Sequence, residues 1–227
     1  MAPRLLKGIA GIDEAGRGPM FGPLVVCGVS LGPESVLQLA RMGVRDSKTL
    51  TARKREELTP SIRKLAQKVV VEEISAQKID QLRAAGVTLN EIEMTSFASI
   101  AKRLSPAELY LDAADANQER FGALVGTHSG LIDKGCKVIS EHKADARYTV
   151  VGAASIVAKT TRDAVIAQLH EEYEDIGSGY PSDPKSVAYL RALIDNEKEL
   201  PPFVRRSWKS VLKRVQKKEM FQEELDF

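Results

Sequence analysis

The sequence predicts an α/β or α+β domain in which helices pack on a central sheet and the C-terminal portion is helical. Strand-like segments dominate the first half and helical periodicity the second. The run LVVCGV is continuously apolar, which is typical of a strand covered on both faces. With 227 residues, 43% hydrophobic and 28% charged, the composition is that of a globular protein with a core, which excludes a disordered, tail-like protein.

The first half supplies a hairpin, a helix and a further strand. Segments 8–13 and 23–31 are rich in Val and Ile, and the connection GRGPMFGP is rich in Gly and Pro. A basic helix is expected over 51–67, and a strand over 68–74 follows it.

The rest of the chain, from residue 88 on, supplies two short strands and most of the helices. Over 88–104 the apolar positions fall on one helical face, which predicts a helix. Strands are expected over 108–111 and 137–140, the first ending at Asp112. Segment 177–184, GSGYPSDP, is predicted to be a loop. Further helices are expected over 148–173, over 184–198, and from 204 to near the C-terminus.

Cysteine usage and hydropathy bear on the compartment. Cys27 and Cys136 lie 109 positions apart without the paired spacing of a zinc site or disulfide framework, so both are interpreted as small buried hydrophobes. No apolar stretch approaches the length of a membrane helix, and residues 1–7 lead into a strand pattern instead of a signal peptide. A cytoplasmic protein is therefore expected.

Four acidic residues occupy the edges of predicted elements: Asp13, Glu14, Asp112 and Asp145. Neighbouring strand residues point to opposite faces, so Asp13 and Glu14 serve one centre only if the chain turns there or one offers its backbone carbonyl. The following AGRG permits that turn. A carboxylate cluster would repel itself unless divalent cations such as magnesium or manganese neutralised it. The alternative is that each acid is a solvated turn residue.

Several motifs occur together along the chain. The first is GIDEAGRGPMFGPLVV, a strand with an Asp-Glu pair followed by Gly-Arg-Gly-Pro. The later ones are DSKTL at 46–50, LYLDAAD at 109–115, HKADARYTVVGAASIVAK at 142–159, RD at 162–163, GSGYPSDP at 177–184 and FVRRSWKSV at 203–211. In sequence and in order these motifs resemble type 2 ribonuclease H, in particular the single-chain archaeal form.

The resemblance implies a ribonuclease H-like α/β fold with a central mixed sheet flanked by helices and a helical C-terminal extension. Residues 1–200 would form the catalytic domain, and 201–227 a basic helix and acidic tail packed on it or continuous with it. The implied activity is endonucleolytic hydrolysis of RNA in RNA–DNA hybrids, with incision 5′ of single ribonucleotides in duplex DNA. Two Mg²⁺ or Mn²⁺ ions per active site would leave 3′-hydroxyl and 5′-phosphate ends.

The resemblance also assigns roles to residues of this chain. Asp13, Glu14, Asp112 and Asp145 would be the catalytic metal ligands. The motif Gly16, Arg17 and Gly18 would hold the ribonucleotide's 2′-hydroxyl and phosphate, and the Tyr180 ring would pack on the next sugar. Ser47 and Lys48 are candidate phosphate contacts. A flexible turn, a packed loop anchor and a solvated loop are the respective alternatives for these last three groups.

Other features bear on partners. Residues 205–218 contain seven basic residues and no acid, which suits a duplex backbone. The pair Lys159 and Asp163, at i and i+4, is interpreted as a surface or structural pair, and His142 is a candidate for ordering the metal loop or for gating product release. The expected partners are RNA–DNA hybrid and ribonucleotide-containing DNA, with a weak sliding-clamp contact through residues 222–227 and no membrane, for a monomer.

Two rival classes are weighed against this interpretation. A DNA-cutting recombinase of the same fold would cleave all-DNA substrates, but Gly16–Gly18 and Tyr180 argue against it. A non-catalytic hybrid-binding module would be expected to lack at least one of the four acids, and all four are present.

Overall fold

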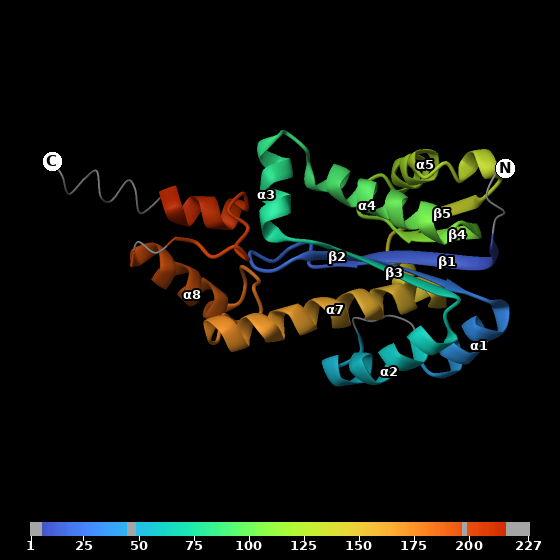
Figure 1. The fold of residues 1–227 in the computed structure, drawn as a ribbon, viewed down its shortest axis with the longest axis horizontal. Helices are drawn as coiled ribbons and strands as arrows, with labels where there is room; N and C mark the ends of the chain where they lie inside the picture. The colour runs from blue at the N-terminus through green and yellow to red at the C-terminus, as the bar shows by residue number, and fades with distance from the viewer. Residues whose placement is uncertain (1–5, 45–48, 197–198, 217–227) are drawn as a thin grey trace. The chain divides into compact units, whose positions relative to one another are not determined.

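The computed structural model describes residues 6–44, 49–196 and 199–216 (Figure 1). By its contacts the chain divides into two compact units. Of the described residues, the first comprises 6–15, 25–44, 49–73 and 89–161, and the second comprises 16–24, 74–88, 162–196 and 199–216.

A five-stranded mixed sheet runs through the first unit. Its strands are β1 (Leu6–Ala15), β2 (Leu24–Leu31), β3 (Lys68–Ile74), β4 (Pro106–Asp112) and β5 (Lys137–Glu141). They are ordered β3-β2-β1-β4-β5. β1 and β2 form the expected antiparallel pair, whereas β1 with β4 and β4 with β5 run parallel. This arrangement confirms the predicted mixed α/β sheet.

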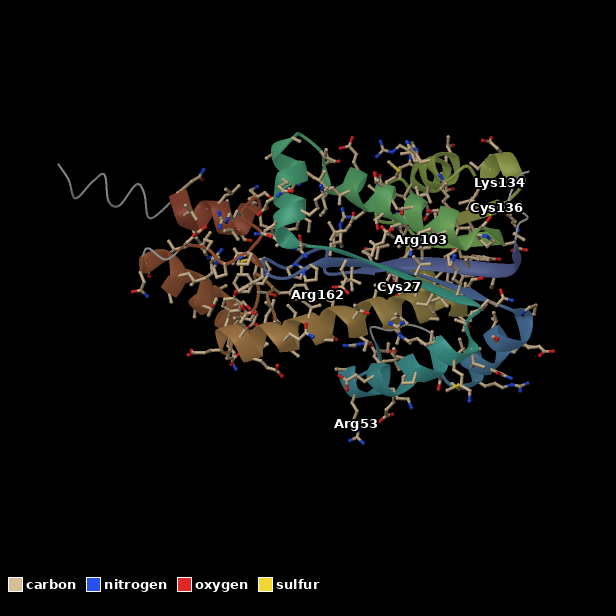
Figure 2. The ribbon with its side chains drawn as sticks, viewed as in Figure 1. Cys27, Arg53, Arg103, Lys134, Cys136 and Arg162 are labelled. Carbon is tan, nitrogen blue, oxygen red and sulfur yellow. The ribbon has the colours of Figure 1, made fainter. Side chains whose placement is uncertain are left out.

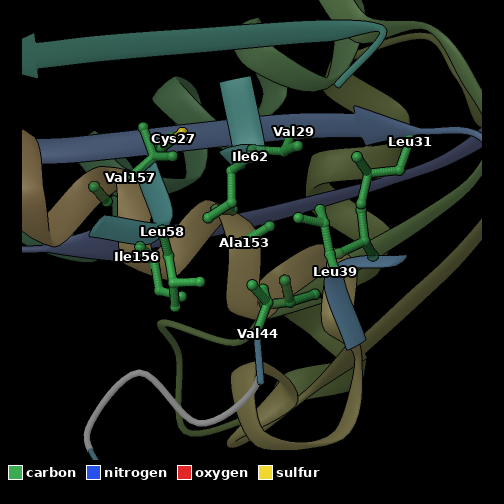
Figure 3. Close-up of a cluster of buried hydrophobic side chains, with 14 of the residues drawn as sticks. Cys27, Val29, Leu31, Leu39, Val44, Leu58, Ile62, Ala153, Ile156 and Val157 are labelled. Carbon is green, nitrogen blue, oxygen red and sulfur yellow. The ribbon is translucent and has the colours of Figure 1, made fainter. Parts of the chain in front are cut away.

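Helices cover both faces of that sheet (Figure 1). Those on one face are α1 (Pro33–Arg41), α2 (Ala52–Leu65) and the first part of α7 (Thr149–Tyr173), and those on the other are α4 (Leu89–Leu104) and α5 (Gln118–His128). All eight residues of β2 are buried, as its unbroken apolar run predicts. Figure 3 shows the core between β2, α1, α2 and α7, where Val29, Leu39 and Ile62 are completely buried.

Two glycines let helices approach the sheet closely. A Cβ on Gly11 of β1 would lie 2.5 Å from the backbone C of Val150 and N of Val151, at the start of α7. On β2, a Cβ on Gly28 would lie 2.4 Å from the Ile100 side chain of α4. Since real Cβ atoms do not approach other atoms this closely, both packing distances require glycine.

Both cysteines are free and buried (Figure 2). Burial raises the pKa of the Cys27 thiol well above its usual value, and it raises the pKa of Cys136 to about 11. Both thiols are therefore protonated at neutral pH, which confirms the prediction of small buried hydrophobes.

The second unit gathers segments that are distant in the sequence. It contains α3 (Ala76–Ala84), the end of α7, α8 (Pro184–Asp195), the loop 16–24 and a helix over 209–216. Its core centres on Phe21, which is completely buried and makes an edge contact with Phe203 at 5.5 Å between ring centroids. The loop 16–24 is thus anchored through an apolar side chain.

The last helix begins later than predicted. Val204 forms an isolated antiparallel bridge with Phe21, and the helix starts at Lys209 instead of residue 204. The reason is that residues 203–205 are buried in extended and turn conformations against the 16–24 loop.

The sequence analysis also missed several short helices, namely α1, α3, α5 and α6 (Ala144–Arg147), the last of which contains Asp145. Residues 199–216 of the expected C-terminal segment lie in the second unit, and the division into 1–200 and 201–227 stays a prediction. None of the helices in the described ranges is long and apolar enough to span a membrane.

Candidate active site

The ends of the parallel strands β1 and β4 bring two of the predicted acids to the same edge of the sheet. Ile12 pairs with Leu111, so Asp13 and Asp112 are the next residues along their strands. Asp13 is buried, with 3% of its surface exposed. The backbone N–H of Ala144 donates to Asp112 Oδ1 at 2.9 Å, which ties β4 to the start of α6. Asp145 is the next residue and is also buried.

Electrostatic repulsion links Asp13 to Glu14 and Asp112. Burial raises the pKa of Asp13 well above its usual value, and the neighbouring Glu14 and Asp112 carboxylates raise it further. Two groups act in the opposite direction: the charge of Lys159 and a hydrogen bond from the Ser155 hydroxyl. Asp13 therefore lies in a site whose negative charge is only partly compensated.

Ser155 and Lys159, one turn apart on α7, are functional candidates that the sequence analysis did not identify. Lys159 Nζ donates to Ser155 Oγ at 2.6 Å, and Ser155 donates to Asp13. The interpretation of Lys159 and Asp163 as a structural pair overlooked this arrangement. The signal in the sequence was the i, i+4 spacing of Ser155 and Lys159.

The turn expected after the first two acids lies within the AGRG segment, at Gly16. β1 continues through Ala15, and the backbone N–H of Glu14 donates to Asp13 Oδ1 at 2.7 Å within the strand. The chain leaves the strand at Gly16, whose φ of +90° favours glycine. Glu14 nevertheless acts on Asp13 through its charge.

The four predicted ligands offer only carboxylate oxygens, which is the chemistry that a hard divalent cation prefers. They are Asp13, Glu14, Asp112 and Asp145. Within the described ranges, however, no three acidic, His or Cys side chains are grouped closely enough to hold a metal ion as they stand. Mutual repulsion of Asp13, Glu14 and Asp112 opposes a closer grouping, and a bound cation would reverse that balance. The chemistry of the residues therefore fits a divalent cation, although the described side chains are not grouped as ligands around one point.

In the second unit, the structure brings together the predicted recognition residues. A Cβ on Gly18 would lie 3.6 Å from Tyr180 Cε1, so the glycine and the ring are neighbours. Gly18 and Tyr180 are both exposed, the latter by 39%. The Arg162 guanidinium lies over the Tyr180 ring at 5.2 Å from its centroid. Gly18 and Tyr180 thus form one exposed surface, whereas Gly16 is buried and Arg17 is half-buried.

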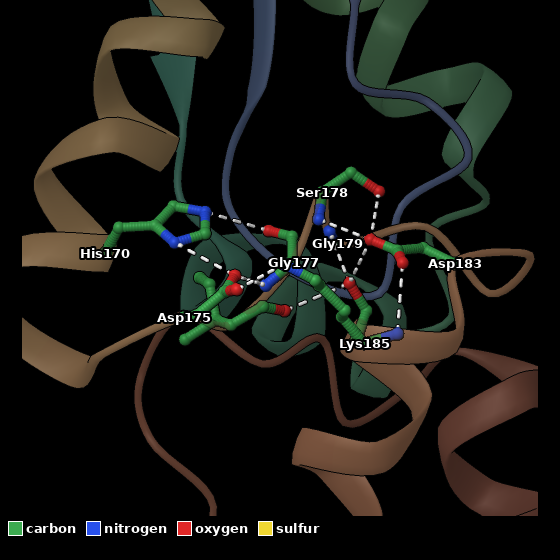
Figure 4. Close-up of polar contacts among 9 residues, drawn as sticks. His170, Asp175, Gly177, Ser178, Gly179, Asp183 and Lys185 are labelled. Carbon is green, nitrogen blue, oxygen red and sulfur yellow. Dashed lines mark hydrogen bonds and ion pairs between the residues drawn. The ribbon is translucent and has the colours of Figure 1, made fainter.

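A polar network holds the loop that carries Tyr180 (Figure 4). Asp183 accepts from the backbone N–H and the hydroxyl of Ser178, at 2.6 and 2.7 Å, and caps α8 through the backbone N–H of Lys185. These hydrogen bonds lower the pKa of Asp183 to about 2. His170 lies 3.1 Å from the Gly177 carbonyl oxygen and 3.5 Å from Asp175.

Other predicted residues are placed differently. Ser47 and Lys48 lie outside the described residues, as do residues 222–227. His142 is exposed, with its Nε2 3.3 Å from the Ala116 carbonyl oxygen. Arg205 was counted in a basic surface stretch but is completely buried, so it cannot contact a duplex backbone there. Its partners are carbonyl oxygens of the 16–24 loop.

Comparison with known proteins gives a consistent result. The sequence model of the family described as Ribonuclease HII matches residues 10–211. The chain is 43% identical to "Ribonuclease HII" of Thermococcus sibiricus over 212 residues, 92% of each chain. It is 44% identical to the protein of that name from Methanoregula boonei over 210 residues, covering 92% of this chain and 95% of the relative.

Solved structures agree in fold. The ribonuclease H2 of Pyrococcus horikoshii matches with a TM-score of 0.84 and 37% identity, covering 92% of this chain and 97% of that one. The Archaeoglobus fulgidus structure titled as a PCNA:RNase HII complex matches with a TM-score of 0.81 and 41% identity, covering 89% and 94%. The chain therefore belongs to the ribonuclease HII family, the metal-dependent endonucleases that degrade the RNA of RNA–DNA hybrids.

Proposed function

We propose that this protein also incises duplex DNA 5′ of single embedded ribonucleotides, and that it cleaves with two divalent cations held by Asp13, Glu14, Asp112 and Asp145. The observation that carries the proposal is the buried Asp13 carboxylate beside the charges of Glu14 and Asp112. A site with this excess of buried negative charge suits cations, and carboxylate oxygens suit Mg²⁺ and Mn²⁺.

The chain's own residues prepare the site for hydrolysis. When bound, two such cations would supply an activated water and stabilisation of the leaving 3′ oxygen, giving 3′-hydroxyl and 5′-phosphate ends. Ser155 fixes the orientation of the Asp13 carboxylate through its hydrogen bond. Lys159, held on Ser155, offsets part of the negative charge before any cation arrives.

Recognition of the ribonucleotide is assigned to the exposed surface of Gly18 and Tyr180. The 2′-hydroxyl is the group that distinguishes RNA from DNA at one position. At Gly18, backbone can approach a ligand without hindrance by a Cβ, and Tyr180 offers a ring face for an adjacent sugar. In sequence, Ala15 alone separates Glu14 from Gly16, so recognition and hydrolysis are assigned to consecutive stretches of chain.

The experiment maps the cut and the chemistry of the ends. A duplex with one ribonucleotide, labelled at its 5′ end, is incubated with Mg²⁺ or Mn²⁺ and then with chelator. We expect a cut on the 5′ side of the ribonucleotide, and a labelled product that a DNA polymerase extends directly because it ends in a 3′-hydroxyl.

Two results would contradict the proposal. A cut on the 3′ side that leaves a cyclic phosphate would indicate attack by the 2′-hydroxyl instead of water. Undiminished cleavage in chelator would exclude the metal centre.

A second proposal concerns the sliding clamp. The Archaeoglobus fulgidus relative is titled as a complex with PCNA, and this chain ends in QEELDF, which has Gln, Leu and one aromatic residue in order. We propose that residues 222–227 of a monomeric, cytoplasmic enzyme bind the clamp weakly. Deletion of residues 222–227 should abolish clamp binding in surface plasmon resonance, whereas unchanged binding would exclude this segment.

A further inference from the structure

Arg205 has an unusual environment for a cation. Its side chain is completely buried, and its Nε donates to the Gly22 carbonyl oxygen at 3.0 Å. Its Nη1 donates to the Arg17 carbonyl oxygen at 3.4 Å. The guanidinium also lies over the Trp208 ring, 4.7 Å from the centroid. Burial, assisted by the charge of Arg162, lowers the pKa of Arg205 to about 9, so it remains a cation at neutral pH.

Trp208 binds the carbonyl group of the 16–24 loop that directly follows that of Arg17. Its indole Nε1 donates to the Gly18 carbonyl oxygen at 3.2 Å. Arg205 and Trp208 thus hold the carbonyl groups of Arg17 and Gly18, which are consecutive in the motif.

Backbone hydrogen bonds hold the rest of the loop on both sides. Met20 donates to the Gly179 carbonyl oxygen at 2.7 Å, next to Tyr180. Arg205 itself donates through its backbone N–H to the Met20 carbonyl oxygen at 2.8 Å, and Gly22 donates to Phe203 at 2.8 Å. The carbonyl groups of Arg17 and Gly18 therefore belong to a loop that is hydrogen-bonded on both sides.

Because the peptide group is planar, fixing the direction of the Arg17 carbonyl group also fixes the direction of the Gly18 N–H. The Arg17 carbonyl group and the Gly18 N–H belong to one planar trans peptide, and they point in opposite directions. Since the buried Arg205 binds the Arg17 carbonyl oxygen, the Gly18 N–H points away from Arg205. Gly18 itself is exposed. The next peptide has no N–H because residue 19 is Pro19, so Trp208 fixes it through its carbonyl group alone.

We propose that Arg205 and Trp208 are positioning residues that hold the Gly16–Gly18 loop with the Gly18 N–H turned outward, where it donates a hydrogen bond to the 2′-hydroxyl of a ribonucleotide. This inference rests on the proposed recognition of single ribonucleotides. It assigns ribonucleotide discrimination in part to two side chains that do not themselves touch the substrate.

The test measures discrimination separately from affinity. In an Asp13→Asn background, which prevents cleavage, Kd is measured by fluorescence anisotropy for two duplexes that differ by one 2′-hydroxyl. Trp208→Phe retains the ring beside Arg205 but loses the N–H donor, and Arg205→Lys retains the charge but loses the two-pronged donor. Arg83→Gln is the matched control, because exposed Arg83 also lies over the Trp208 ring, at 5.8 Å.

The decisive quantity is the Kd for the all-DNA duplex divided by the Kd for the duplex with the ribonucleotide. We expect Trp208→Phe to lower the ratio about threefold and Arg205→Lys about tenfold, as for the loss of a hydrogen bond that orients a donor. The Kd for all-DNA duplex should stay unchanged in both, and Arg83→Gln should keep the full ratio. An unchanged ratio in Trp208→Phe, or an equal loss of affinity for both duplexes, would overturn the proposal. Equal Kd values for both duplexes in the parent protein would instead overturn the proposed function itself.

Discussion

Substitution of Gly11 by Ala would separate two elements on which the carboxylate site depends. The added Cβ would lie 2.5 Å from backbone atoms of Val150 and Val151, where ordinary contact is 3.4–4 Å. β1 and the start of α7 would therefore have to move apart by roughly 1 Å, since backbone atoms cannot rotate out of the way. Asp13 lies two residues after Gly11, and α7 begins soon after Asp145.

The cost follows from the size of this overlap. Overpacking a core costs about 1–3 kcal/mol, and a clash of Cβ with backbone belongs at the upper end, about 3 kcal/mol. For a chain of this size about 1 kcal/mol lowers Tm by about 2–4 °C, so we expect Tm to decrease by about 6–12 °C. A displacement of about 1 Å at Asp13 should lower kcat about 100-fold.

Thermal unfolding by circular dichroism and single-turnover cleavage of an RNA–DNA hybrid check both effects. Gly32→Ala is the matched control, because its Cβ would meet only Gln67 Nε2, at 3.5 Å, and its φ is −80°. The control should lose no more than about 1 kcal/mol, as expected for a change at a helix N-cap. A Gly11→Ala protein with the Tm and the rate of the parent would refute the reasoning.

Three further substitutions test separate parts of the account. Asp13→Asn should lower turnover by more than about 100-fold. Its Tm in chelator should be unchanged or higher, because burial and repulsion already disfavour the Asp13 carboxylate. Near-normal cleavage would remove Asp13 from the catalytic set. Tyr180→Ala should lower kcat/KM on single-ribonucleotide duplexes about tenfold and on continuous hybrids less, and an equal loss on both would contradict its assigned role. Asp183→Ala should cost about 1 kcal/mol at neutral pH as a lost helix cap. Since the pKa of Asp183 is lowered from 3.8 to about 2, its contribution is present above pH 3.8 and is lost as the pH falls through about 2, so denaturant unfolding of parent and variant should converge there.

Much of the fold could be predicted because the pattern of apolar residues in the sequence agrees with the burial of those residues in the structure. β2 reads as an unbroken apolar run because helices cover both of its faces, and β3 coincides with the predicted range 68–74. The acids at the strand ends could be located because an apolar run followed by a Gly-rich segment marks in the sequence where a strand ends. The short helices α1, α3 and α5 were missed because each is only 9–11 residues long, at or below the length over which helical periodicity can be recognised in a sequence.

The environment of Arg205 could not be predicted. A cation within a basic run reads as a surface residue, yet its partner at Gly22 lies 183 positions away in the sequence. The roles of Ser155 and Trp208 likewise depend on contacts that only the fold creates.

The measurement that tests the central claim most directly compares two duplexes that differ by one 2′-hydroxyl group. Single-turnover cleavage of both is followed with Mg²⁺ present and with chelator. The account predicts incision only in the duplex with the ribonucleotide, and only with metal. Comparable incision of the all-DNA duplex would contradict recognition of the 2′-hydroxyl and would indicate a general DNA-cutting nuclease of the same fold.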